Sequence, residues 1–488
     1  MKLSRMVLAI ASVIVVLHLA TNGHYGFHRD ELQTLDDARY FDWGFVAYPP
    51  LTPFFGRVAQ FLFGNWVAGA RVFPALAQAL VIVLGGLMAR ELGGGPLAQI
   101  VAALSIAIAP VALGSGALLQ YVAFDFLWWV VLAFLVMKLQ RTGDERWWLA
   151  IGAAIGLGMM TKYTMLFLAG MAVGLALGGG VRYLKSKWLW AGVALSLLIF
   201  LPNAIWQFRH QFITLDFLKY IHARDIRIGR TKDFLPEQLW IGANAFTIPL
   251  WIAGLVYCFR QKSLRVIGWM FVVPLVLFTI AKGRGYYLAP AYPMLLAAGA
   301  VWAEQWVLRL KPTASRSVLA TTFALIAIGG ALIAPIALPI TPINSKWFNI
   351  NGDFREEIGW QDLAQETARI YQALPAAERE HTGIFAANYG EAGAIGMYRD
   401  KYGLPRPIGW TNTYWLRGYP TPPPDKLIVL GLHREHVDAL FESCTWAGHN
   451  GNSYGVKNEE SEDHPDIFLC GSPREGWPEF WRQHRHFG

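Results

Sequence analysis

Carboxylates in apolar surroundings are the first residues of this sequence that could carry chemistry. Asp125 is a lone carboxylate inside the apolar run QYVAFDFLWW, and Asp30 and Glu31 in HRDEL closely follow an apolar segment. A carboxylate within a membrane span costs on the order of 3 kcal/mol on insertion scales, so a function or a buried partner is expected. Such a group can act as a general base that takes a proton from a nucleophile.

Cationic residues supply the opposite charge. Lys162 lies between two apolar stretches in MMTKYTM, and Lys282 and Arg284 are separated by a glycine in AKGRGYY. Two cations in one turn bind an anion well, because charge-assisted hydrogen bonds to phosphate or carboxylate are strong. An alternative reading of Lys162 is a snorkelling side chain at a helix end.

Aromatic and basic residues near these cations extend the candidate set. Tyr286, Tyr287 and Tyr292 follow the KGRG turn, and they fit either a ligand site or the aromatic belt at a membrane surface. A loop at 209–237 is rich in basic residues, among them Arg224 and Arg227. His28, Arg224, Arg227 and Tyr292 are therefore further candidates, with less specific patterns.

The elements that must position these groups are membrane helices. Of the 488 residues, 54% are hydrophobic and only 16% are charged, a composition that excludes a soluble globular enzyme and a disordered chain. Spans of about 15 to 25 apolar residues predict about eleven transmembrane helices. Their predicted limits are 6–21, 66–89, 96–114, 117–137, 147–161, 163–181, 188–207, 238–259, 266–281, 286–308 and 317–340.

Charge in the connecting loops predicts the orientation. The net charge of +8 comes from Lys and Arg gathered in alternate loops, which marks the cytoplasmic side and makes a nucleic-acid partner unnecessary. The loop at 22–65, the loop at 209–237 and everything after residue 341 then face outward. This predicts a multi-pass protein of the bacterial inner membrane, with the first span retained as an anchor and the C-terminal part in the periplasm.

The chain changes character after residue 341. Residues 1–341 are predicted to form the transmembrane domain, and 342–488 a small α/β domain with strands at Thr382–Ala387 and Lys426–Gly431 and helices at Glu356–Leu374 and Glu435–Phe441. Cys444 and Cys470 are expected to form a disulfide in this exported part. The loop at 22–65 is predicted to hold an amphipathic helix with its acidic residues on the water-exposed face.

In this topology the acids at 30, 31 and 125 and the cations at 162, 282 and 284 meet at one membrane surface. A carboxylate base facing a cationic patch suits transfer from a membrane-bound phosphate donor. The carboxylate removes a proton from the incoming nucleophile, and the cations stabilise the phosphate as it leaves.

At these residues the sequence resembles the GT-C superfamily of glycosyltransferases that use lipid-phosphate sugars, in particular the protein O-mannosyltransferase-like family with the lipid A aminoarabinose transferases. The similar segments are HRDEL, YPPL (Tyr48–Leu51), Asp125, TKYT (Thr161–Thr164), LPNAIWQ (Leu201–Gln207) and KGRGYYLAPAYP (Lys282–Pro293). This resemblance implies that Asp30 is the catalytic carboxylate, with Glu31 and Asp125 as the family's further acids.

The same resemblance implies a donor site and an inverting reaction. The residues that would hold the polyprenyl phosphate are Lys162, Lys282, Arg284 and Tyr287. The configuration at the anomeric carbon would be inverted in a single displacement on the outer face of the membrane. Family members differ in needing a divalent cation such as Mg or Mn. Asp30, Glu31 and Asp125 are the candidate ligands if this chain needs one, which the sequence leaves open.

The leading functional hypothesis is thus a glycosyltransferase, acting as a monomer, that moves a hexosyl or pentosyl group from a polyprenyl-phosphate carrier to a lipid, glycan or protein acceptor. One alternative is a glycan ligase or polymerase that uses a lipid diphosphate. The other is a transporter or flippase of a lipid-linked sugar, because charges within spans also mark translocation paths. An inverted repeat would favour the transporter, and the sequence shows none.

Overall fold

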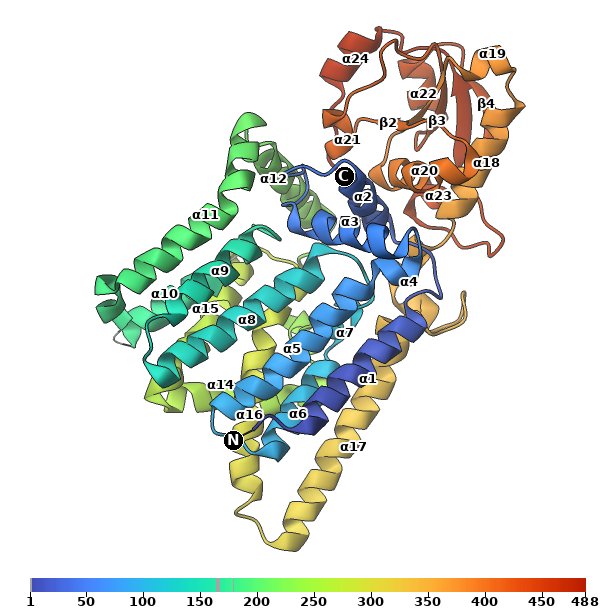
Figure 1. Cartoon of the computed structure of the whole chain (residues 1–488). Coiled ribbons are helices and arrows are strands. Elements are labelled where there is room, and N and C mark those ends of the chain that lie inside the picture. The colour runs from blue at the N-terminus through green and yellow to red at the C-terminus, as the bar shows by residue number, and fades with distance from the viewer. Residues whose placement is uncertain (1, 164–166, 179) are drawn as a thin grey trace.

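A bundle of helices carries a smaller α/β part at one end in the computed structural model of the chain (Figure 1), which describes residues 2–163, 167–178 and 180–488. The helices of the bundle are α1 (Arg5–Thr21), α4 (Val67–Ala70), α5 (Val72–Glu91), α6 (Pro96–Ala107), α7 (Pro110–Ser115), α8 (Tyr121–Thr142), α9 (Trp147–Met159), α10 (Phe167–Leu177), α11 (Lys187–Arg209), α14 (Ile248–Arg260), α15 (Arg265–Ile280), α16 (Tyr292–Val307) and α17 (Pro312–Ala337).

Long apolar helices make the bundle a membrane structure. Five helical segments of the described chain are long and apolar enough to cross a bilayer: 72–91, 121–142, 187–209, 262–280 and 312–337. Further apolar helices are shorter, at 5–21, 96–107, 147–159, 168–177 and 245–260. The count of eleven spans stays a prediction, and part of the span predicted at 163–181 lies outside the described residues.

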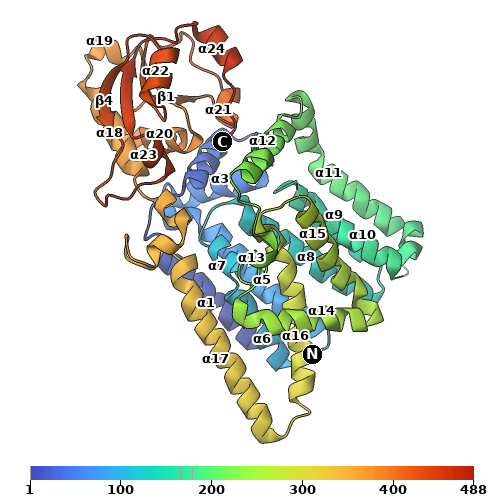
Figure 2. The ribbon, with the colours of Figure 1, turned by 180° about the vertical axis from the view of Figure 1, so that it is seen from behind.

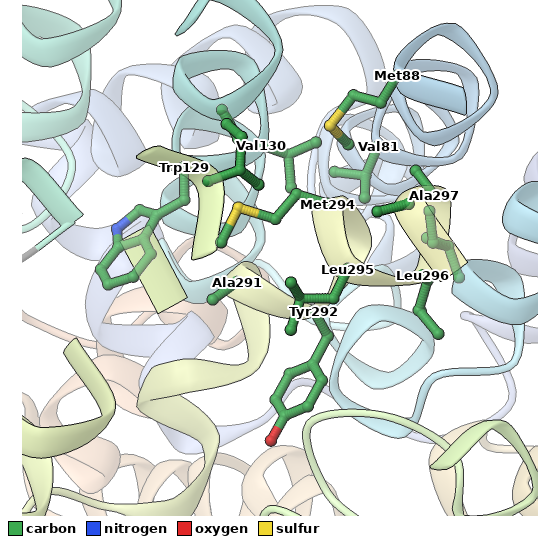
Figure 3. Packing of buried hydrophobic residues seen from close by; sticks show 14 of the residues in the cluster. Val81, Met88, Trp129, Val130, Ala291, Tyr292, Met294, Leu295, Leu296 and Ala297 are labelled. Carbon is green, nitrogen blue, oxygen red and sulfur yellow. The ribbon is translucent and has the colours of Figure 1, made fainter. Parts of the chain in front are cut away.

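Helix α16 lies at the centre of the bundle (Figure 3). Its Tyr292, Met294, Leu295 and neighbours contact Val81 and Met88 of α5 and Trp129 of α8 in one continuous core. Small residues allow α14 to touch α16, because a Cβ at Gly254 would come within 1.9 Å of the Leu295 carbonyl oxygen. Close backbone contact of this kind is how apolar helices associate where burial from water provides little driving force.

Short helices of the two long connections lie toward the end of the bundle that carries the α/β part, with α2 against that part and α12 to one side of it (Figures 1 and 2). They are α2 (Arg29–Arg39), α3 (Leu51–Phe63), α12 (Ile213–Arg227) and α13 (Phe234–Glu237). A helix was expected at α2, but its predicted water-exposed acidic face is wrong: Glu31, Asp36 and Asp37 are all buried. The α/β part covers this face, and the sequence pattern of α2 alone gave no sign of that cover.

The C-terminal part is a five-stranded sheet with helices on both faces. Its strands are β1 (Thr382–Ala386), β2 (Pro407–Gly409), β3 (Lys426–Leu430), β4 (Thr445–His449) and β5 (Asp466–Cys470), in the order β2-β1-β3-β5-β4. The first three strands are parallel, while β5 pairs antiparallel with both β3 and β4. The strands predicted at 382–387 and 426–431 are confirmed as β1 and β3.

Alternation along the strands sorts the core into two layers. Ile384 and Ile428 face α18 (Trp360–Ala373) and α20 (Tyr389–Tyr402), while Phe385 and Val429 face α22 (Arg434–Leu440) and α24 (Trp477–Gln483). A disulfide joins Cys444 and Cys470. The other short elements of this part are α19 (Ala376–Arg379), α21 (Thr413–Leu416) and α23 (Glu459–Asp463).

Turns of 3-10 helix connect several elements. They are Gly180–Lys185, Ala245–Thr247, Lys262–Leu264, Gly285–Ala291, Phe348–Ile350 and Gly352–Glu357. The helix predicted at Glu356–Leu374 thus begins later, at Trp360, because the chain first forms the 3-10 turn that ends at Glu357. The helix predicted at Glu435–Phe441 is confirmed as α22.

Helix α20 lies directly against α2 through three glycines spaced by three residues. A Cβ at Gly393 would stand 2.8 Å from the backbone of Leu32, and one at Gly396 would stand 2.6 Å from Asp36 Oδ1. Gly390 similarly faces Arg29. With no side chains between them, the two helices hold the α/β part tightly on the end of the bundle.

Replacing Gly393 by Val should therefore lower stability by about 1–3 kcal/mol, since the added atoms overlap the α2 backbone, which has no free space to move into. The measurement is the thermal unfolding midpoint of the purified protein in detergent. Gly352→Val is the control, because a Cβ at Gly352 meets nothing within 4 Å. Equal midpoints for the two variants would contradict the close contact of α2 with α20.

Candidate functional site

The start of α2 fixes the position of Asp30. His28 caps the helix, with its Nδ1 accepting from the Asp30 backbone N–H at 3.1 Å, and the Glu31 carboxylate accepts from the His28 backbone N–H at 2.9 Å. This reciprocal capping box orients the first turn. The Asp30 carboxylate lies beside this cap, with Oδ2 4.0 Å from His28 Nδ1.

Glu31 is buried in an ion pair with Arg71, which immediately precedes α5. Arg71 Nη2 is 2.6 Å from Glu31 Oε2 and 3.1 Å from Glu357 Oε2, and the side chains of Arg71 and Glu31 have no exposed surface. Glu31 Oε1 also accepts from the Leu119 backbone N–H at 2.7 Å. Its carboxylate lines neither cavity described below, so Glu31 anchors α2 instead of facing the site as predicted.

Both carboxylate oxygens of Asp30 accept hydrogen bonds. Gln120 Nε2 donates to Oδ2 at 2.6 Å, and the Tyr389 hydroxyl donates to Oδ1 at 2.9 Å. Burial by itself raises the pKa of the Asp30 carboxyl, but the nearby His28 and Arg29 and these two donors outweigh it and lower the pKa below its ordinary value. Asp30 is therefore a carboxylate at neutral pH.

Two cavities meet at Asp30. The larger, of about 590 Å³, has an apolar wall made by α7 and α17 and a polar wall with acids and bases, including His28, Asp30 and Glu357. The smaller, of about 160 Å³, lies on the other side of Asp30. Arg29, Asp30, Gln120, Arg230 and Arg284 line both cavities. Groups bound in the two cavities would thus approach each other beside the Asp30 carboxylate.

Positive charge distinguishes the smaller cavity from the larger one. Among the described residues that line the small cavity, Asp30 is the one acid, and the basic ones are Arg29, Lys162, Arg224, Arg230 and Arg284. In the large cavity, Asp30, Glu237, Asp353 and Glu357 balance the cations. The lining of the small cavity therefore favours a ligand with negative charge more than that of the large cavity does. Acids outside the lining pair with three of its cations: Glu459 with Arg29, Asp125 with Lys162 and Asp225 with Arg284.

Aromatic rings and one carboxylate hold Lys162 in place. Its Nζ lies 3.9 Å from Asp125 Oδ2 and 4.2 Å from the ring centre of Tyr287, with the rings of Tyr121 and Tyr286 at 5.1 and 5.5 Å. Asp125, the lone carboxylate of α8, thus has a cationic partner that is largely shielded from solvent. Because Asp125 lines neither cavity, it acts on the site through Lys162.

A second ion pair fixes Arg284. Its Nε lies 2.6 Å from Asp225 Oδ2 on α12, and Arg224 lies 3.9 Å from the other oxygen of that carboxylate. The link ties the KGRG turn to the basic loop, and it directs Arg284 toward both cavities. Asp225 was not among the predicted site residues, because a buried acid in a basic loop has no distinctive pattern.

Besides Glu31 and Asp125, three more predicted site residues line neither cavity. Lys282 and Arg227 are exposed, and Tyr292 is buried in the bundle with its hydroxyl donating to the Gln238 backbone oxygen at 3.1 Å. Of the similar run TKYT, the structure describes Thr161 to Tyr163. Within the same turn, Lys282 is exposed whereas Arg284 is partly buried and pairs with Asp225.

The three carboxylates that were candidate metal ligands do not converge. Glu31 is engaged by Arg71 and by backbone N–H groups, while Asp125 pairs with Lys162. Within the described residues, no group of three or more His, Cys, Asp or Glu side chains is arranged to hold a metal ion. The donor set therefore does not fit a shared divalent cation.

Several residues of the site escaped the sequence analysis. Gln120 and Tyr121 stand just before Asp125 in the same run, Arg230 is one of many basic residues in its loop, and Tyr389 and Asn412 belong to the distant α/β part. For Gln120 and Tyr121, a helix start beside a predicted site was a usable indication, whereas nothing in the sequence distinguishes Arg230 from the other basic residues of its loop. For Tyr389 and Asn412 there was none, because their approach depends on how the two parts dock.

Comparison with known proteins first defines the class. Residues 47–206 match the family model described as dolichyl-phosphate-mannose-protein mannosyltransferase, a stretch that includes Asp125 and Lys162 but not Asp30. The crystal structure of ArnT from Cupriavidus metallidurans in the apo state superposes with a TM-score of 0.62 at 15% identity, covering 95% of this chain and 97% of that one. The fold is therefore that of the GT-C glycosyltransferases, which confirms the resemblance predicted from the sequence.

Sequence comparison finds particular relatives of the chain. The chain is 28% identical over 290 residues to undecaprenyl phosphate-alpha-4-amino-4-deoxy-L-arabinose arabinosyl transferase 1 of Pseudomonas fluorescens, with 54% of this chain and 50% of that protein covered. It is 25% identical over 300 residues to the lipid A galacturonosyltransferase RgtD of Rhizobium johnstonii, with 57% and 61% covered. The chain thus spans about half the length of the curated relatives it matches.

One similar structure contains a lipid. ArnT from Cupriavidus metallidurans has been solved bound to undecaprenyl phosphate, and that structure superposes with a TM-score of 0.58 at 15% identity, covering 95% of this chain and 97% of that one. At this identity the likeness concerns the fold. It gives no residue of the present chain a role.

The Glu357 side chain predicts how stability depends on pH. Burial raises its pKa to about 7, although Arg71 lowers it. In the unfolded chain the carboxyl ionises near its ordinary pKa of about 4.3. The folded protein therefore holds an extra proton between these values, and stability should fall as pH rises toward 7, by at most about 1.4 kcal/mol per pH unit.

Glu357→Gln should flatten this part of the curve, because the amide does not titrate. Thermal midpoints of wild type and variant, measured from pH 5 to 8, test the expectation. Glu378→Gln is the matched control, since Glu378 is an exposed partner of Lys426 in the same part of the chain. The expectation is contradicted if the wild-type midpoint rises between pH 5 and 7 and the Glu357→Gln substitution abolishes that rise.

Proposed function

We propose that the protein is an inverting glycosyltransferase that moves a sugar from a polyprenyl monophosphate carrier to an acceptor. The observation that carries the proposal is the Asp30 carboxylate between two cavities, one lined by five basic residues and the other by mixed polar and apolar groups. A glycosyl phosphate needs cations for its phosphate and a base on the opposite side for the acceptor. The two cavities supply those environments on the two sides of one carboxylate.

Each residue then has a stated task. Lys162 and Arg284, with Arg224 and Arg230, neutralise the donor phosphate in the small cavity, where Tyr287 holds Lys162 in place. Asp30 accepts the proton of the acceptor hydroxyl while that oxygen attacks the anomeric carbon. The bond from the anomeric carbon to the phosphate oxygen breaks, the carrier leaves as polyprenyl phosphate, and the cations stabilise its growing charge.

The size and place of the cavities favour this reaction over the alternatives. A cavity of about 160 Å³ accommodates on the order of ten water-sized groups, enough for one sugar ring. The charged groups lie at the ends of α8, α9 and α15, on one side of the bundle, whereas transporter sites usually lie near the bilayer midplane.

The proposal also includes the division of the chain into two domains and their orientation in the membrane. Residues 1–341 form the transmembrane transferase domain, and residues 342–488 form a domain on the periplasmic side of the bacterial inner membrane. The support is the distribution of Lys and Arg, which gather in the loops away from the site. The acceptor is a lipid, glycan or protein that reaches the large cavity.

Asp30→Asn tests the base. Transfer should fall by roughly 10²- to 10⁴-fold, because the amide cannot take the acceptor proton, while binding of the donor persists. The assay follows radiolabelled sugar from a polyprenyl-phosphate donor in proteoliposomes. Asp400→Asn, an exposed carboxylate on α20, is the control. Full activity of Asp30→Asn would remove Asp30 from the mechanism.

Arg284→Gln tests the anion site. The loss of one charge from the small cavity should weaken polyprenyl monophosphate binding by about 10-fold or more, since hydrogen bonds to charged groups contribute about 1.5–3 kcal/mol. Binding is measured directly with the lipid and the purified protein. Lys282→Gln, two residues away and exposed, should bind as wild type does. If Lys282→Gln weakens binding and Arg284→Gln does not, the two residues have been assigned the wrong way round.

A further inference from the structure

The α/β part supplies one wall of the small cavity from a particular edge of its sheet. The chain leaves parallel strand β1 at Ala386 and begins α20 at Tyr389, and it leaves β2 at Gly409 and reaches Asn412. Tyr389 and Asn412 both line the small cavity. The carboxyl ends of parallel strands commonly form ligand sites in α/β sheets. Here that edge faces the end of the bundle, against the start of α2.

Tyr389 is held rigidly at this edge. Asn388 and Glu391 form a capping box that fixes the first turn of α20, and the Tyr389 side chain is buried with Arg29 5.9 Å from its ring centre. Gly390 allows α20 to approach Arg29 without an intervening side chain. The tyrosine hydroxyl is therefore placed by two helices in direct contact, and it reaches Asp30 Oδ1 at 2.9 Å.

We infer that Tyr389 is a positioning residue for the Asp30 carboxylate, supplied by the C-terminal part of the chain; this inference rests on the proposed function. Each carboxylate oxygen can accept about two hydrogen bonds. Tyr389 occupies one site on Oδ1 and Gln120 occupies one on Oδ2, so the carboxylate plane is fixed while an acceptor hydroxyl can still bind.

This arrangement has two effects on Asp30. A donor that bonds to the ionised carboxylate favours that form, so Tyr389 helps to keep Asp30 ready to accept a proton at neutral pH. The same bond sets the direction from which the acceptor hydroxyl is deprotonated. The C-terminal part therefore belongs to the reaction centre itself, beyond any role in stability or acceptor binding.

Tyr389→Phe, which keeps the ring and removes the hydroxyl, tests the inference in the full-length protein. We expect kcat for sugar transfer to fall roughly 10- to 100-fold, the size of one hydrogen bond to a charged group, with donor KM within about 2-fold of wild type. The acidic limb of the kcat–pH profile should move to higher pH. Tyr371→Phe is the matched control, because its hydroxyl donates to the Arg379 backbone oxygen in the same part of the chain.

The outcomes separate the possibilities. An unchanged kcat and acidic limb in Tyr389→Phe would overturn the inference, as would an equal loss in Tyr371→Phe, which would indicate a general effect on stability. If the wild-type protein transfers no sugar, the proposed function fails. The inference about Tyr389 is then tested by titrating the carboxylate infrared band of Asp30, which is identified as the band that disappears in Asp30→Asn. A higher midpoint for that band in Tyr389→Phe supports the inference without activity, and an unshifted midpoint overturns it.

Discussion

The buried ion pair between Arg71 and Glu31 is the interaction on which the arrangement of the site depends. Arg71 stands at the start of α5, Glu31 in the first turn of α2, and Glu357 in the turn that leads into the α/β part. One guanidinium thus joins three separate segments where water is excluded. Removing one partner of such a pair typically costs about 3–5 kcal/mol, because a charge is left buried and uncompensated.

The same anchor explains why Asp30 and Glu31 play different parts although they are neighbours in sequence. Successive positions of a helix point in directions about 100° apart, so the two carboxylates cannot face the same surroundings. Glu31 turns toward Arg71 and is fully buried, whereas Asp30 turns toward the junction of the cavities. The second acid of the pair thereby holds the first in position.

Sequence reasoning predicted the apolar helices and the strands β1 and β3, because long apolar runs have few alternative explanations. It also singled out Asp30, Lys162 and Arg284 as charges near apolar runs, and the structure brings all three to the small cavity. It misjudged the acidic face of α2 and the surroundings of Glu31. The acidic face depends on residues more than 300 positions away, such as Arg417, which pairs with Asp36 and Asp37. The surroundings of Glu31 depend on Arg71 and Leu119, 40 and 88 positions away. Local patterns carry no information about contacts of that range. Tyr389 and Asn412 were missed for the same reason.

Helix α17 forms one wall of the large cavity and has few contacts with the rest of the protein. Ile333 and Ile336 form part of the cavity wall, yet only 11% of the most apolar window of α17 is buried inside the protein, and the helix lies at the outside of the bundle beside α1 (Figures 1 and 2). Most of the apolar surface of this helix therefore faces the bilayer and not the protein. In the proposed reaction, a lipid acceptor dissolved in the bilayer therefore reaches the large cavity sideways, between helices, and only its polar end has to meet water.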